Sequence, residues 1–188
     1  MLAWDRALFE LLNQTGQNRL FDVLMPFITD FDHWKIPLAL VVVGLCGWGG
    51  KQGRRVVLLA LLTVALSETL TSHILKPWVA RLRPCHVLPQ VHLLVGCSSS
   101  YSFPSSHAAN SLGLATVFGY YYRRWAWLFV ALALLVGYSR IYVGVHYPLD
   151  VLGGQVVGVL SAAGILAAGH ALSRRGKGRL TEDTDDGK

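Results

Sequence analysis

Three short groups of polar residues interrupt a mostly apolar sequence, and their side chains suit phosphate chemistry. The group at residues 139–150 places Arg140, His146 and Asp150 within about three helical turns of one another. It lies where two long apolar segments meet, so burial in a membrane gives no reason for its charges. A carboxylate beside an imidazole fixes the tautomer of the ring and leaves its second nitrogen free as a nucleophile. These three side chains are therefore candidates for a phosphoryl-transfer site.

A second group contains Lys76, Arg83 and Pro84, after an apolar segment at residues 56–74. A lysine and a forked guanidinium neutralise and orient the anionic oxygens of a phosphoryl group. Pro84 fixes the backbone next to Arg83. The alternative is that these are basic residues at a helix end in contact with lipid headgroups.

The remaining group reads Phe-Pro-Ser-Ser-His at residues 103–107. A proline followed by serines predicts the start of a helix, where free backbone N–H groups and the helix dipole favour an anion. Ser105 is expected to cap this helix or donate to the anion, and His107 is placed beside it. The alternative is an ordinary capping sequence with an incidental histidine.

The composition indicates an integral membrane protein. Of the 188 residues, 53% are hydrophobic and only 15% are charged, so much of the surface must face something other than water. The net charge of +6 comes from short clusters between apolar segments rather than from one basic face. That pattern argues against nucleic acid as a partner and for orientation in a membrane.

The elements that must position these groups are expected to form an all-α, polytopic bundle. Two N-terminal pieces at residues 2–12 and 21–31 are too polar to cross a membrane and predict interfacial helices. Five spans are predicted, at residues 34–48, 56–74, 105–122, 125–145 and 148–172. We expect one domain over residues 1–172, with an outer loop at 76–104, an outer join at 139–150 and a disordered cytoplasmic tail at 173–188.

The basic clusters predict the orientation of the bundle. With five spans the clusters fall on one side, which the positive-inside rule makes cytoplasmic: Lys51, Arg54, Arg55, Arg123, Arg124, Arg174, Arg175, Lys177 and Arg179. Lys76, Arg81, Arg83 and Arg140 lie on the outer side against this rule, which indicates an anionic ligand. We expect a multi-pass protein of the bacterial inner membrane whose site faces the periplasm or exterior.

Cysteines add one constraint. Cys85 and Cys97 share the outer loop, and in an oxidising compartment a disulfide between them would contribute about 3 kcal/mol by the loop-entropy estimate. Cys46 lies within the first span and is interpreted as a small buried hydrophobe.

The order and spacing of the three groups resemble the type 2 phosphatidic acid phosphatase family. Its pattern is Lys, six residues and Arg-Pro; then Pro-Ser-Gly-His; then Ser-Arg, five residues, His, three residues and Asp. The sequence matches at Lys76, Arg83, Pro84, Pro104, Ser105, His107, Ser139, Arg140, His146 and Asp150. It departs at Ser106, where the family has glycine; activity is expected to survive because serine is small and keeps its N–H.

The resemblance implies a mechanism. His146 attacks phosphorus to give a phosphohistidine, Asp150 orients its ring, and His107 protonates the leaving oxygen. The phosphate-binding residues are implied to be Lys76, Arg83, Ser105, Ser106 and Arg140. No metal or other cofactor is implied.

The substrate class follows from the same resemblance. The implied partners are the bilayer and an amphiphilic lipid phosphate or pyrophosphate. An undecaprenyl-type pyrophosphate comes first, phosphatidylglycerophosphate or phosphatidate second, and a lipid A phosphate third. The sequence does not decide between these lipids, and it leaves the oligomeric state open.

Three other interpretations remain open at this point. A metal hydrolase would draw ligands from His73, His86, His92, His107, His146 and Asp150. Their spacing lacks a paired-ligand motif, and the nearby Lys and Arg would repel a cation. Vanadium-dependent haloperoxidases share the family's fold but are soluble. A transporter or scaffold that binds anionic lipid would need the cations alone, without a nucleophile, an orienting carboxylate and an acid.

Residues 153–164 carry several small side chains, including the pair Gly154 and Gly158. This spacing permits two helices to approach closely. It predicts packing within the bundle near the site, with dimerisation as the alternative.

Overall fold

The computed structural model describes the backbone of residues 2–185 and the side chains of residues 2–174. This part of the chain is helical, without strands, and its α-helices are α1 (Ala3–Glu10), α2 (Arg19–Thr29), α3 (Phe31–Gly47), α4 (Gly50–Glu68), α5 (Lys76–Val79), α6 (Pro84–Val87), α7 (Ser106–Tyr121), α8 (Ala126–Tyr142) and α9 (Pro148–Asp185). A π-helical segment, Leu11–Thr15, extends α1, and a second, Thr69–Leu75, joins α4 to α5. A 3₁₀ turn, Arg123–Trp125, precedes α8.

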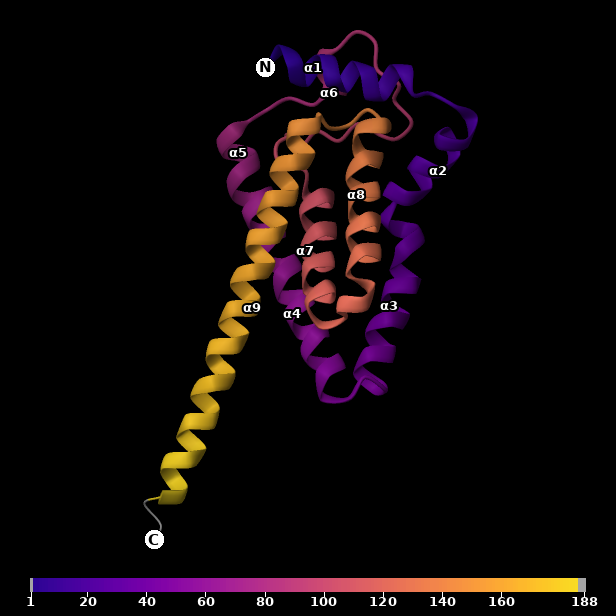
Figure 1. The fold of residues 1–188 in the computed structure, drawn as a ribbon. Helices are drawn as coiled ribbons and strands as arrows, with labels where there is room; N and C mark the ends of the chain where they lie inside the picture. Colours follow the sequence, from indigo (N-terminus) through magenta and orange to yellow (C-terminus); the bar gives the residue numbers. More distant parts are fainter. Residues whose placement is uncertain (1, 186–188) are drawn as a thin grey trace.

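Helix α7 is the centre of the bundle. It packs against α4, α8 and α9, while α2 packs against α8 and α3 against α4. Helix α1 lies across one end of the bundle, and α9 extends well past the other helices at the opposite end (Figure 1). The predicted all-α architecture is confirmed.

Glycines bring α7 and α9 into backbone contact. A Cβ atom on Gly158 would lie 2.1 Å from the carbonyl oxygen of Ala109, and one on Gly154 would lie 2.2 Å from that of Ser105. The backbone N–H of Ser105 also donates to the carbonyl oxygen of Asp150 at 2.8 Å. The small-residue pair is therefore used inside the bundle, and it seats the first turn of α7 against the first turn of α9.

Three helical stretches of the described chain are long and apolar enough to cross a membrane: Gly50–Val87, Arg123–Tyr142 and Pro148–Arg174. Apolar side chains on their outer faces are exposed, among them Leu61, Leu132 and Leu160. Such faces suit lipid rather than water, so the chain is a membrane protein.

Helices α3 and α7 are shorter than these three stretches. They have 17 and 16 residues, about 25 Å of helix against a hydrocarbon core of about 30 Å. Five spans therefore remain a prediction.

The structure corrects the start of the outer loop. The sequence predicted a loop from Lys76, but the helix runs on through Thr69–Leu75 into α5 and ends at Ala80, whose φ is +49°. Pro77 has no N–H to donate, and the helix passes it directly after the wider π-helical segment, where the N–H of Lys76 bonds to the carbonyl oxygen of Thr71. Lys76 is therefore held on a helix, and the loop begins after it.

The N-terminal half also differs in detail. A helix forms as expected over most of residues 2–12, whereas residues 21–31 divide between α2 and α3. Asp30 separates the two helices, and its carboxylate accepts a hydrogen bond from the N–H of Asp32 at 3.0 Å. Cys46 is exposed on α3, not buried as predicted, because only part of the surface of α3 contacts the bundle.

At its other end, α9 continues to Asp185. The side chains from residue 175 and the whole of residues 186–188 lie outside the described structure. The disordered tail at 173–188 remains a prediction.

The basic clusters that predict a cytoplasmic end and the cations of the three polar groups lie at opposite ends of the bundle. Arg55, at the start of α4, donates through Nη2 to the carbonyl oxygen of Gly169 at 3.1 Å and to Ser173 Oγ at 3.0 Å. The turn between α7 and α8, with Arg123 and Arg124, is at this same end (Figure 1). The end covered by α1 carries the three polar groups.

The glycine contacts predict a stability difference along one helix. Replacing Gly158 with Ala places its Cβ against the α7 backbone, and overpacking of this kind costs about 1–3 kcal/mol. The thermal midpoint in detergent should fall by roughly 5 °C or more. Gly164 on the same helix is the matched control, because a Cβ there meets nothing within 4 Å. Equal midpoints for the two alanine variants would contradict the proposed packing.

Candidate active site

His146 lies in the short join between α8 and α9. The chain turns there through Gly144, whose φ is +84° and whose Cβ position would clash with Val91. The turn is closed by a hydrogen bond from the N–H of His146 to the carbonyl oxygen of Arg140 at 3.2 Å. Only 1% of the His146 side chain is exposed, so its surroundings determine its protonation.

The partners of the imidazole fix its tautomer. Arg83 Nη1 lies 3.1 Å from His146 Nε2, and a guanidinium can only donate. Nε2 therefore accepts, and the ring proton is on Nδ1. That nitrogen faces Asp150 Oδ2 at 3.6 Å and Ser102 Oγ at 3.4 Å. The lone pair of Nε2 is the one available to an electrophile once Arg83 moves off it.

Asp150 is completely buried and accepts hydrogen bonds on both oxygens. Oδ2 accepts from Ser102 Oγ and from the N–H of Tyr147, the latter at 2.9 Å. Oδ1 accepts from Arg81 Nη1 at 2.7 Å. These bonds fix the carboxylate in the first turn of α9, with Oδ2 directed to His146.

Arg83 connects the group that contains Lys76 and Arg83 with the group at residues 139–150. It is 4% exposed, and its guanidinium donates to the carbonyl oxygen of Val145 at 3.0 Å. It also donates to Ser100, through Nε to the carbonyl oxygen at 2.8 Å and through Nη2 to Oγ at 2.9 Å. A phosphate bound to this guanidinium would lie next to His146.

Lys76 connects the same group with the group at residues 103–107. Its Nζ donates to Ser106 Oγ at 2.9 Å, and Thr71 and Ser72 place their hydroxyls 3.2 and 3.1 Å from the same atom. Ser106, where the family has glycine, thus adds a hydroxyl that holds Lys76. Ser105 is the N-cap residue of α7 but its side chain makes no capping bond, and its buried Oγ has no partner among the described residues.

His107 and Arg140 line a pocket of about 650 Å³ beside this cluster. Arg140 Nη1 donates to Thr29 Oγ1, and its buried Nε has no partner in the described part of the chain. The other lining residues come from α2, the start of α3 and the outer loop: Val23, Pro26, Phe27, Thr29, Asp30, Phe31, His33, Val95 and Gly96. The pocket combines the Arg140 cation, two imidazoles, the Thr29 hydroxyl and the Asp30 carboxylate with apolar side chains.

Asp5 and Ser102 are residues of the site for which the sequence predicted no role, and Arg81 has a different role from the one predicted. Arg81 had been grouped with the cations held for an anionic ligand, but its guanidinium is shared between Asp5 and Asp150. Nothing in the sequence distinguishes Asp5 or Ser102, because their partners are distant in the chain. Arg81 alone carried a signal, as a cation on the outer side.

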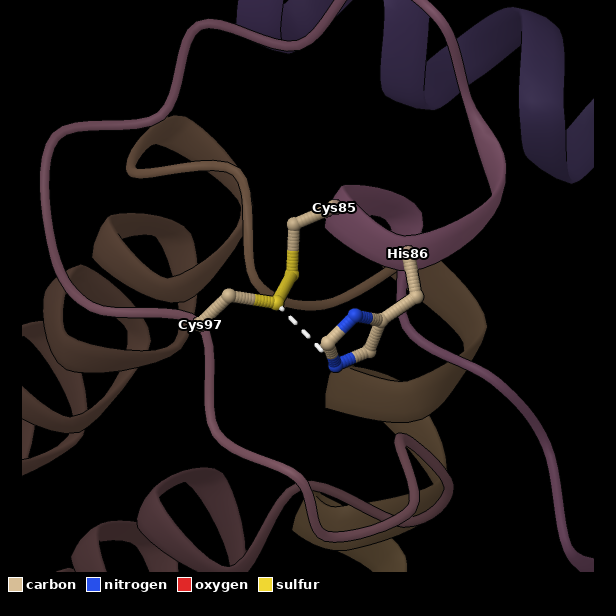
Figure 2. Close-up of side chains that lie close together, drawn as sticks. All are labelled: Cys85, His86 and Cys97. Atoms are coloured by element: carbon tan, nitrogen blue, oxygen red, sulfur yellow. Dashed lines mark hydrogen bonds between the residues drawn. A yellow bond between two sulfur atoms is a disulfide. The ribbon is translucent and has the colours of Figure 1, made fainter.

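Cys85 and Cys97 form a disulfide in the outer loop, the pairing considered from the sequence, with Cα atoms 6.3 Å apart (Figure 2). His86 Nε2 lies 3.3 Å from Cys97 Sγ, and these three residues form a cluster of potential metal ligands. Both sulfurs are held in the disulfide. Cys85 is two residues from Arg83 and Cys97 is three from Ser100. The disulfide therefore limits the movement of Arg83 relative to its hydrogen-bond acceptor Ser100.

Comparisons with known proteins identify the family of this chain. The model of the PAP2 superfamily matches residues 57–174. The chain belongs to the PAP2 superfamily. The matched range includes all three polar groups and leaves α1, α2 and α3 outside it.

Named relatives extend over more of the chain. Undecaprenyl-diphosphatase BcrC of Bacillus subtilis is 33% identical over 143 residues, which are 76% of this chain and 72% of the relative. Among solved structures, Aquifex aeolicus LpxE has a TM-score of 0.76 at 28% identity, covering 88% of this chain and 96% of that one. A PAP2 type phosphatidylglycerolphosphate phosphatase from Bacillus subtilis has a TM-score of 0.70 at 27% identity, covering 90% and 86%. Membership in this superfamily makes the chain a hydrolase of the phosphatase class.

The disulfide should stabilise both the fold and the phosphate site. Changing Cys85 and Cys97 together to serine removes a constraint worth about 3 kcal/mol, so the thermal midpoint should fall by roughly 5–10 °C. The KM for substrate should rise because Arg83 and Ser100 are no longer tied. Cys46→Ser, a change at an exposed free thiol, is the control. An unchanged KM in the double variant would show that Arg83 does not depend on the disulfide.

Burial lowers the pKa of His146 to about 4, with its contact to Asp150 opposing this shift and Arg83 and Arg140 adding to it. An unfolded histidine titrates near pH 6.5, at about its ordinary pKa. Between these values the unfolded chain binds a proton that the folded chain does not, so stability should fall as the pH is lowered from 6.5 to 4. Thermal midpoints across this range should fall less steeply for His146→Gln than for wild type. Identical slopes would contradict a buried neutral imidazole.

Proposed function

We propose that this PAP2 protein is a multi-pass phosphatase of the bacterial inner membrane that hydrolyses a lipid pyrophosphate, an undecaprenyl-type pyrophosphate first of all. The observation that carries the lipid assignment is the pocket beside the cluster, where Arg140 and His107 lie near apolar side chains such as Val23, Phe27 and Phe31. An amphiphile fits such a pocket, with its charged head at Arg140 and its hydrocarbon along the walls. The similarity to undecaprenyl-diphosphatase BcrC supports the choice of lipid.

In the proposed reaction His146 Nε2 attacks phosphorus in line with the leaving oxygen. The N–P bond forms as the P–O bond to the leaving group breaks, and His107 delivers a proton to that oxygen. Asp150 stabilises the positive charge that develops on the imidazole. Water then attacks the phosphohistidine, His107 takes a proton from it, and inorganic phosphate leaves with His146 restored.

The phosphate oxygens are assigned to donors around His146: Lys76, Arg83, Ser105, Ser106, Arg140 and the N–H groups at the start of α7. Ser105 Oγ and Arg140 Nε suit this role because both are buried without a partner among the described residues. Lys76 and Arg83 now donate to neutral acceptors. An anion would be a stronger acceptor for both, and Arg83 would leave Nε2 as it turns to the phosphate.

The proposed orientation places the site on the periplasmic or outer side. It rests on the basic residues at the α3–α4 turn and the α7–α8 turn, which lie at the end away from the site and mark that end as cytoplasmic. We further propose that residues 1–172 act as one domain, since α1 packs over the site. Five spans would accommodate this arrangement.

A second candidate substrate is phosphatidylglycerophosphate or phosphatidate. It is favoured by the fold likeness to the Bacillus subtilis phosphatidylglycerolphosphate phosphatase. A lipid A phosphate ranks third. All three are lipid phosphates that place an anionic head at the membrane surface.

The test is phosphate release from purified lipids in detergent, with undecaprenyl pyrophosphate, phosphatidylglycerophosphate, phosphatidate and lipid A compared. Wild type should release phosphate fastest from undecaprenyl pyrophosphate. His146→Ala should lose roughly a thousandfold or more in kcat, because it lacks the nucleophile. His170→Ala, which removes a histidine paired with Tyr120 away from the site, should keep full activity.

Several outcomes would decide against the proposal. Full phosphate release by His146→Ala would exclude the phosphohistidine mechanism. Binding of these lipids without release by wild type would favour the non-catalytic alternative. Loss of activity with chelator and recovery with zinc would favour a metal hydrolase.

A further inference from the structure

A chain of buried charges connects the N-terminal helix to the candidate site. Asp5, on α1, is completely buried, as is Asp150. Arg81 lies between them, with Nη2 donating to Asp5 Oδ2 and Nη1 donating to Asp150 Oδ1. The guanidinium also stacks over the ring of Tyr147 with 4.0 Å between its carbon and the ring centroid. Its two terminal nitrogens are thus divided between two carboxylates.

Asp5 also supports the first turn of α9. Its Oδ1 accepts a hydrogen bond from the backbone N–H of Leu149 at 2.9 Å. This N–H is one of the donors that a helix start leaves unpaired. Asp5 therefore fixes both the arginine that holds Asp150 and the helical turn that carries Asp150.

Apolar packing sets α1 in this position. Phe9, one turn after Asp5 on the same face of α1, is completely buried. Its ring packs edge to face against Tyr147, with the centroids 5.3 Å apart. A buried carboxylate is costly unless it is paired and hydrogen-bonded. The position of Asp5 is therefore tied to the docking of α1 by this aromatic contact.

We propose that Asp5 and Arg81 are positioning residues for His146 and Asp150, so that α1 completes the active site. The proposal rests on the proposed phosphatase function. Asp5 accepts from Nη2 of Arg81, so that only Nη1 donates to Asp150, at Oδ1. Asp150 Oδ2 then remains with Ser102, the Tyr147 N–H and His146.

Without Asp5, Arg81 is free to bind Asp150 through both terminal nitrogens. Arginine prefers such a bidentate geometry with carboxylates, and it would draw Oδ2 away from the imidazole. The orientation of His146 would then be lost while the phosphate-binding residues stay in place. This predicts an effect on the chemical step rather than on phosphate binding.

The experiment compares Asp5→Asn with wild type and with Glu10→Gln in detergent. Glu10 is the control because it lies on the same helix and pairs with Arg6 in an exposed salt bridge. Asp5→Asn should lower kcat about tenfold, as loss of a supporting hydrogen-bond partner typically does, with KM within about twofold. Glu10→Gln should match wild type in both constants.

Inorganic phosphate, a product of the proposed reaction, provides a readout of the anion-binding residues, because its binding needs no bond to His146. Its affinity, measured by calorimetry, should stay within about twofold in Asp5→Asn, because this variant leaves every proposed phosphate donor intact. Lys76→Ala should weaken it. A phosphate affinity that falls in Asp5→Asn as much as in Lys76→Ala would show general damage to the site and overturn the positioning role.

A double-mutant comparison tests the route through Asp150. In an Asp150→Asn background, the further change Asp5→Asn should have no additional effect on kcat, because the carboxylate it supports is already gone. Fully additive losses would overturn the proposal. So would Asp5→Asn with wild-type kcat and only a lower thermal midpoint, which would make Asp5 structural.

If Asp5→Asn does not fold, Arg81→Lys replaces it with the same expected outcomes, since a single ammonium keeps the charge but lacks the fork that joins two carboxylates. If wild type releases phosphate and Asp5→Asn has the same kcat, this inference is overturned and the proposed function stands. A wild type that releases no phosphate from any lipid in the panel would overturn the proposed function and this inference together.

Discussion

The buried carboxylate of Asp150 sets the arrangement of the end of the bundle that α1 covers. An ion this deep in the protein is tolerated only when several donors satisfy it. The donors are Ser102 from the outer loop, the Tyr147 N–H from the join before α9, and Arg81 from the segment after α5. Since Arg81 in turn requires Asp5, α1 is included as well. Three segments thus donate to one side chain, and α1 is linked to it through Arg81.

The close packing of α7 against α9 positions the residues of the site. With no side chains between them at Gly154 and Gly158, the first turns of the two helices lie in contact. One turn carries Ser105, Ser106 and His107, and the other carries Asp150. In a membrane, where lipid supplies little driving force for helix association, small residues of this kind let backbones pack closely. The position of the catalytic groups therefore depends on two glycines that have no polar side chain.

The cations of the site are hydrogen-bonded to neutral acceptors. Arg83 is bound to Ser100 and Val145, Lys76 to Ser106, and Arg140 to Thr29. Such bonds keep long side chains ordered and reduce the entropy lost when a ligand binds. They are also weaker than bonds to an anion. The Cys85–Cys97 disulfide acts in the same direction because it links the segment just after Arg83 to the segment just before its acceptor Ser100.

The sequence by itself determined the helical class, the membrane location and the three polar groups, because apolar segments and residue types are local properties that can be read without coordinates. Only the tertiary structure decided the partner of each polar side chain. Asp5 and Leu149 are 144 positions apart, and Lys76 and Ser106 are 30 apart. Their pairing follows from how helices pack, which no local pattern encodes. For the same reason Arg81 looked like a ligand for phosphate, whereas helix packing places it between two carboxylates.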